Sequence, residues 1–205
     1  MSSKDVIFER IRSATAGGVV GAEVPRDYDR ASLVGPGDVD RFAETVDDYR
    51  AQVFRVSESE IAATVHGLLG EGARVVVPVD LPPSWVEGVS TVYDTGLSVD
   101  EFDSVDAVVT GCRVGIAATG TIVLDAGFAQ GRRALTLVPD HHICIVRADQ
   151  VVETVPQAFA VLDATRPLTF VSGPSATSDI ELNRVEGVHG PRRLDVVIVE
   201  TVATS

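Results

Sequence analysis

The sequence predicts a single α/β domain in which a mixed, mostly parallel sheet is flanked by helices. The order strand, helix, strand between residues 51 and 77 has short connections, which imply a right-handed crossover and a largely parallel pair of strands. Continuous apolar runs such as residues 196–199 are typical of strands covered on both faces. A chain of 205 residues with 45% hydrophobic content can bury one sizeable core but is short for two. We therefore expect one domain over residues 1–205.

The N-terminal part of that domain, about residues 1–50, is predicted to be a helical segment. Its first helix is expected at residues 3–16, with Ser3 as a possible cap and a Gly-Gly pair as the stop. Residues 19–37 are rich in glycine and proline and are predicted to form a loop. Asp38 can then cap a second helix, because the apolar side chains that follow it recur on one face.

The rest of the chain alternates strands with short helices. A strand at residues 51–56 precedes a capping box formed by Ser57 and Glu60, and the helix that it starts should continue to about residue 69. A buried strand is expected at residues 73–77. From residue 106 onward, β-branched and apolar runs bounded by turn residues dominate. These runs predict strands at residues 107–110, 116–124, 143–146, 168–172 and 194–199, with one more helix at residues 156–162.

The charge pattern excludes several classes of partner and mechanism. The formal net charge of −13 would repel a nucleic acid or an anionic membrane surface, so any anionic ligand needs a local basic pocket. Lys4 is the only lysine, which argues against a Schiff base, a serine–lysine pair and a phosphate-loop lysine. No apolar window reaches the length of a membrane helix, and the charged start of the chain does not resemble a signal peptide. We expect a cytoplasmic protein with neither nucleic acid nor membrane as a partner.

No cofactor and no metal site is predicted. Cys112 and Cys144 lie far apart in the sequence and belong to no CxxC pair, which fits a reducing compartment and leaves too few thiolates for a cluster. His141 and His142 are adjacent, but neighbouring side chains on a strand point to opposite faces, so one metal ion could not easily take both. The stretch 115–121 has the glycine spacing of a phosphate-binding loop without its lysine.

The segment from Ser172 to Leu182 is the richest candidate for a ligand site. It leaves a strand and passes through Gly and Pro towards an expected helix start, where Ser178 and Glu181 match a capping box. Capping explains the acids but not the density of hydroxyls beside a glycine, where backbone amides could face an anion. Open α/β sheets also bind ligands at loops that follow the carboxyl ends of strands. Binding and plain capping both stay open; the binding candidates are Ser172, Gly173, Ser175, Thr177, Asp179 and Glu181.

A second cluster precedes the last predicted strand. His189 has a glycine close on either side, and Arg192 could pair with a carboxylate in a two-pronged geometry that lysine cannot match. A turn with solvated surface charges explains the same residues. Gly120 and Thr121 complete the candidate ligand-binding set, and no catalytic residue is assigned.

Five phrases of the sequence resemble the signature blocks of the lactate-utilization protein C family, also called LUD domains. They are TGTIVLDAG, GRRALTLVPDHHICIV, ADQVV, RPLTFVSGPSATSDIEL and VEGVHGPR, in nearly the expected order and spacing. The resemblance covers close to the whole chain, and residues 81–105 are its least distinctive part. Ala118 is a departure, because the family's version of that phrase suggests a glutamate.

The resemblance implies a fold akin to the ribose-phosphate isomerase, coenzyme A transferase and formyltetrahydrofolate cyclo-ligase group. It also implies a role in oxidising L-lactate to pyruvate together with iron-sulfur partner proteins. In one hypothesis the chain is an accessory, non-redox subunit that binds a small carboxylate or forms an assembly interface. In the other it is an enzyme acting alone on a carboxylate, thioester or sugar phosphate, with Asp179 or Glu181 as base or nucleophile and Arg192 as anion clamp. A buried acid in the pocket beside residues 172–177 would favour the enzyme, and a pocket of hydroxyls and amides would favour the subunit.

Overall fold

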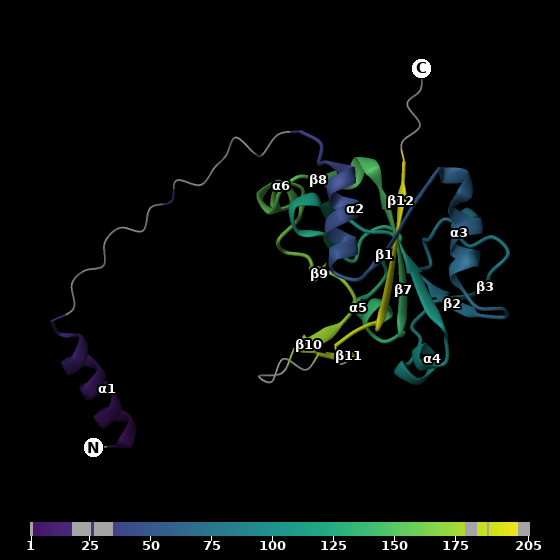
Figure 1. The fold of residues 1–205 in the computed structure, drawn as a ribbon. Coiled ribbons are helices and arrows are strands. Elements are labelled where there is room, and N and C mark those ends of the chain that lie inside the picture. The colour runs from purple at the N-terminus through teal and green to yellow at the C-terminus, as the bar shows by residue number, and fades with distance from the viewer. Residues whose placement is uncertain (1, 18–25, 27–34, 179–183, 188, 201–205) are drawn as a thin grey trace. The chain divides into compact units, whose positions relative to one another are not determined.

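The computed structural model describes residues 2–17, 26, 35–178, 184–187 and 189–200 (Figure 1). The chain divides into two compact units, Met1–Arg30 and Ala31–Ser205. In the first unit, helix α1 (Ser3–Thr15) begins with a capping box in which Ser2 and Asp5 bond reciprocally. The cap is therefore Ser2 and not Ser3. The expected loop at residues 19–37 falls mostly outside the described residues, and the single domain stays a prediction.

The second unit is built on a six-stranded sheet whose neighbouring strands all pair in parallel. Its order is β1 (Gln52–Val56), β12 (Arg193–Val199), β7 (His141–Arg147), β4 (Ala107–Thr110), β2 (Arg74–Val77) and β3 (Ser90–Tyr93). This arrangement confirms the predicted α/β class. One detail of the prediction is wrong, because β1 and β2 run in parallel but are separated by β12, β7 and β4.

Helices cover both faces of this sheet, and Figure 1 shows α2 and α3 on opposite sides of it. Helix α3 (Ile61–Leu68) follows the predicted capping box of Ser57 and Glu60 and packs, with the turn η3 (Pro83–Trp85), on one face. Alternate side chains of the strands point to the other face, where they meet α2 (Val39–Asp48), α4 (Val99–Asp103) and α5 (Arg133–Leu137). Because both faces are covered, β7 and β12 are buried along almost their whole length.

A smaller sheet lies on the same face as α2 and shares its core. It has the order β8 (Val151–Val152), β5 (Val114–Ile116), β6 (Thr121–Leu124) and β9 (Thr169–Val171), and α6 (Val155–Val161) follows β8. The single strand expected at residues 116–124 is therefore wrong. Gly120 adopts the left-handed φ of 56° after a short helical turn at Ala117–Thr119, and this turn reverses the chain into a hairpin.

A third, two-stranded ribbon precedes β12. Strand β10 (Ala176–Ser178) pairs antiparallel with β11 (Arg184–Glu186). Ser178, expected to cap a helix, ends a strand instead, and the rest of the expected helix start falls on residues 179–183, outside the described residues. Among the residues described, no helix combines the length and apolar composition that crossing a bilayer requires.

Candidate functional site

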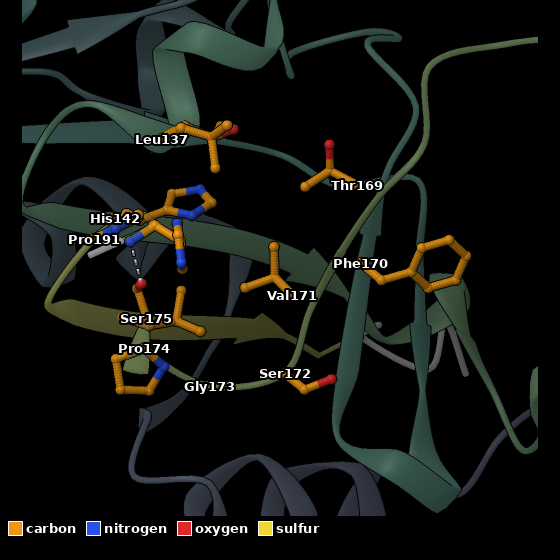
Figure 2. A pocket seen from close by; sticks show the side chains of 14 residues that line it. Leu137, His142, Thr169, Phe170, Val171, Ser172, Gly173, Pro174, Ser175 and Pro191 are labelled. Atoms are coloured by element: carbon orange, nitrogen blue, oxygen red, sulfur yellow. Dashed lines mark hydrogen bonds between the residues drawn. The ribbon is translucent and has the colours of Figure 1, made fainter. Parts of the chain in front are cut away.

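A cavity of about 250 Å³, open to solvent on one side, is lined by α5, the start of β7, β9 with the loop after it, and residues 189–194 (Figure 2). His142 and Leu194, which line it, are register partners and the second residues of β7 and β12. The cavity thus lies at the amino ends of these strands, whereas the sequence argument pointed to carboxyl ends. The difference arises because the loop at Ser172 follows β9, which belongs to the small sheet and not to the parallel one.

Hydroxyl and imidazole groups supply the polar side chains of the cavity. The hydroxyls belong to Thr136, Thr169, Ser172 and Ser175, and the imidazoles to His142 and His189. Leucine, valine, phenylalanine and proline side chains form the remainder, and neither a carboxylate nor an arginine occurs among the described lining residues. Such a surface can hydrogen-bond a small polar ligand from several sides while packing against an apolar part.

The candidates Gly120 and Thr121 lie behind this cavity and support it. The Thr121 hydroxyl is 2.8 Å from that of Ser172 and also 2.8 Å from that of Thr119. A Cβ on Gly120 would meet the backbone of Thr45 at 2.6 Å, so only glycine allows this turn to lie against α2. Thr121 therefore holds the Ser172 hydroxyl, and Gly120 lets the turn that carries Thr121 lie against α2.

Ser175 joins the loop after β9 to the segment that leads into β12. Its backbone N–H donates to the carbonyl of Pro191 at 2.8 Å, and its own carbonyl accepts from the N–H of Gly187 at 3.0 Å. Its hydroxyl accepts from the N–H of His189 at 3.1 Å. The two clusters chosen from the sequence are thus held together by three hydrogen bonds at one residue.

The preceding residue, Gly173, brings this loop against α2. Its φ is +80°, and a Cβ at this position would lie 2.5 Å from the carbonyl oxygen of Tyr49. A residue with a side chain would therefore have to shift the loop away from the helix.

His142 is a cavity residue that the sequence reasoning did not select. It is only 2% exposed, and its Nε2 lies 2.8 Å from the hydroxyl of Thr110 on the neighbouring strand. A histidine within an apolar strand was the available signal; the sequence favours a role for a single histidine over a shared metal site but does not show which ligand it would meet. As expected for adjacent strand residues, His141 turns to a different partner, its Nε2 lying 2.8 Å from the buried carboxylate of Asp195.

Two buried thiols lie behind His142. The hydrogen bond with Cys112 is the largest cause that lowers the pKa of Cys144, burial opposes it, and contacts with His142 and Thr110 add to the lowering; together they bring the pKa to about 5. The same contact and burial raise the pKa of Cys112. Neither thiol lines the cavity, and no group of three or more His, Cys, Asp or Glu side chains able to hold a metal ion occurs in the described ranges.

The remaining candidates stand apart from the cavity or outside the described residues. Arg192 is 63% exposed, lies 3.5 Å from Asp140, and is not among the described lining residues. Thr177 lies in β10, and the structure describes only its backbone. Asp179 and Glu181 fall within the undescribed residues 179–183. Ser172, Gly173, Ser175 and His189 all line the cavity, and their role in binding stays a prediction.

The fold and the cavity define an α/β protein with a small hydroxyl- and imidazole-lined hollow beside a parallel sheet. Residues 98–199 match the LUD domain. A lactate utilization protein C of Deinococcus radiodurans is 47% identical over 182 residues, spanning 86% of this chain and 84% of that protein. The chain therefore belongs to the LUD-domain family of lactate utilization protein C, and this membership supports a role in lactate utilization.

Two further comparisons differ in how much of each relative they cover. A lactate utilization protein C of Halalkalibacterium halodurans is 33% identical over 50% of this chain and 47% of its own. Among solved structures, a DUF162 family protein from Deinococcus radiodurans has a TM-score of 0.68 and 41% identity, covering 84% of this chain and 99% of that one. The structural relative agrees with the α/β architecture described above.

Proposed function

We propose that this protein is a non-redox subunit of a system that oxidises L-lactate to pyruvate, and that it holds a small carboxylate in the cavity while iron-sulfur partner proteins carry the electrons. The observation that carries the proposal is the cavity itself, with hydroxyls, imidazoles and apolar side chains on its described walls. Family membership supports lactate utilization as the setting.

The assignment of electron transfer to partners rests on the donor set of the chain. Oxidising a 2-hydroxy acid releases two electrons, which a cofactor has to accept. Iron-sulfur clusters are held by sets of cysteine ligands, and this chain has only Cys112 and Cys144, both buried in the core. Partner proteins with fuller cysteine sets fit this task.

The stand-alone enzyme has less support. Such an enzyme needs a displaced acid or base near its substrate, and no carboxylate lines the described part of the cavity. Arg192, its suggested anion clamp, lies beside Asp140 and is largely exposed.

A reconstitution assay tests the proposal. The purified chain is incubated with L-lactate and an artificial electron acceptor, first alone and then with candidate iron-sulfur partner proteins, and pyruvate is measured. We expect turnover only in the mixture, reduced when this chain is left out. Turnover by the chain alone, without added cofactor, would refute the subunit assignment, and full turnover without the chain would refute its requirement.

A further inference from the structure

His142 differs from the other polar groups of the cavity in how firmly it is placed. His189 is exposed on a loop, and Ser172 and Ser175 also belong to loop segments. His142 is instead 2% exposed and sits on β7, a central strand of the six-stranded sheet. Figure 2 shows His142 among the side chains that line the cavity, together with Leu137 and Val171.

Contacts behind the ring fix its orientation. Thr110 on β4 engages Nε2 at 2.8 Å, and Thr110 is the register partner of Cys144, whose thiol also contacts His142. Thr110 and Cys144 are neighbours across the two strands on the face that carries His142, so the Nε2 side of the ring is directed along this face towards β4. Nδ1 is the nitrogen that Thr110 does not engage.

The size and charge of the cavity limit its ligand. A volume of about 250 Å³ is below the usual range of pockets for drug-sized ligands. A short acid with a few heavy atoms fits within it. Since the described lining residues include no arginine or lysine, one carboxylate can be met by imidazole and hydroxyl donors, whereas a second would have no cation to face.

We propose that Nδ1 of His142 is the donor that recognises the carboxylate of the ligand, and that the cavity selects short 2-hydroxy or 2-oxo monocarboxylates. The hydroxyls of Thr169 and Thr136 meet the remaining oxygens, and Leu137 and Leu194 face the apolar end of the acid. This inference rests on the proposed function and names the residue and the ligand class of the same cavity.

Two substitutions separate the two ring nitrogens. Asparagine keeps an N–H donor near the position of Nδ1, and glutamine keeps one near the position of Nε2. Calorimetry with L-lactate and pyruvate compares the native chain, His142→Asn and His142→Gln. We expect His142→Gln to bind about 10- to 100-fold more weakly, the loss expected for a hydrogen bond to a charged group, and His142→Asn to lose clearly less.

Controls accompany these variants. His66→Asn, at an exposed histidine on α3, should bind like the native chain. Succinate should bind the native chain at least about tenfold more weakly than L-lactate, because the described lining residues offer no arginine or lysine to its second carboxylate. In the native protein, ¹⁵N resonances of labelled histidine should move at Nδ1 of His142 on addition of lactate, a readout that needs no variant to fold.

Three other results would each contradict a different part of the proposal. If the native chain binds lactate while both His142 variants keep its affinity, or if the Nε2 resonance moves in place of Nδ1, the assignment of His142 Nδ1 is overturned and the proposed function stands. Equal affinity for succinate overturns the ligand class. If the native chain binds neither lactate nor pyruvate, the carboxylate site of the proposed function fails, and this inference fails with it.

Discussion

The hydroxyl of Ser175 accepts a hydrogen bond from the backbone N–H of His189 at 3.1 Å, which links residues fourteen positions apart across the mouth of the cavity. Ser175→Ala removes this acceptor and leaves the two backbone bonds of residue 175 in place. We expect the free energy of unfolding to fall by about 1 kcal/mol, the usual net value of a neutral hydrogen bond, as measured by urea denaturation. Ser90→Ala, at an exposed position in β3, is the control and should stay within about 0.5 kcal/mol. Equal stability of Ser175→Ala and the native chain would contradict the role of this bond.

Two glycines with the same φ allow the contact of Gly173 with α2 to be measured. Gly173 and Gly88 both have φ +80°, but a Cβ at Gly88 would meet nothing within 4 Å, whereas one at Gly173 would lie 2.5 Å from the Tyr49 oxygen. Gly88→Ala should cost about 1 kcal/mol for the left-handed backbone alone. Gly173→Ala should cost about 3 kcal/mol, because the overpacking adds to the strain. Thermal or urea unfolding measures both; equal losses would mean that the loop does not depend on its approach to Tyr49.

The acid dependence of stability should include a contribution from Asp94. Its carboxylate accepts hydrogen bonds from Arg132 at 2.8 and 3.0 Å, and these hold the pKa of Asp94 below its ordinary 3.8 against the opposing effect of burial. A folded-state pKa below the unfolded value means that the stabilisation is complete above pH about 4 and is lost as the pH falls through the folded-state pKa.

Asp94→Asn tests this dependence. We expect it to be less stable than the native chain at pH 7, by about 1 kcal/mol because Arg132 is nearly half exposed, and the difference should disappear in strong acid. Asp80→Asn, which removes a carboxylate at an exposed position of the same loops, is the control for the change of charge. A stability difference that is constant from acid to neutral pH would contradict the pairing.

The two thiols should be unreactive in the folded protein. The lowered pKa of Cys144 favours a reactive thiolate at neutral pH, but Cys144 is 0% and Cys112 only 4% exposed, so a reagent cannot reach either sulfur without local opening. Burial should win. A chromogenic disulfide reagent is expected to label two thiols per chain in urea and almost none under native conditions within the same time. Rapid native labelling of Cys144 would show instead that the cavity opens to it.

Elements whose signals are local were predictable from the sequence. The capping box of Ser57 and Glu60 is a property of four residues, and it starts a helix where expected. The apolar run of β12 predicted that a strand forms there. It could not predict which strands lie beside it, because strand order depends on contacts between residues distant in the sequence. The hairpin at Gly120 was missed for a related reason: a left-handed glycine inside an apolar run looks like any other strand glycine until the opposing strand is known.

The candidate site likewise contains residues that the sequence could predict and residues that it could not. Ser172, Gly173, Ser175 and His189 were chosen for their hydroxyls and glycines, and they do lie around one cavity. Arg192 was included for its charge, and the direction of an arginine on a turn cannot be deduced from its neighbours in sequence. His142 was passed over because a strand buried on both faces has no polar alternation to indicate which of its side chains meets a cavity.

The position of β12 in the sheet has a consequence for the order in which the chain can fold during synthesis. β1 is bonded to β12 along its length, with Gln52 opposite Asp195, and β12 in turn meets β7. β1 is synthesised early, but it cannot form its hydrogen bonds to β12 until residues near 199 have emerged from the ribosome. Pairing between strands so far apart in the sequence is slow. Leu194 and the segment before it also complete the cavity, so the ability to hold a ligand should be acquired only at the last stage of folding.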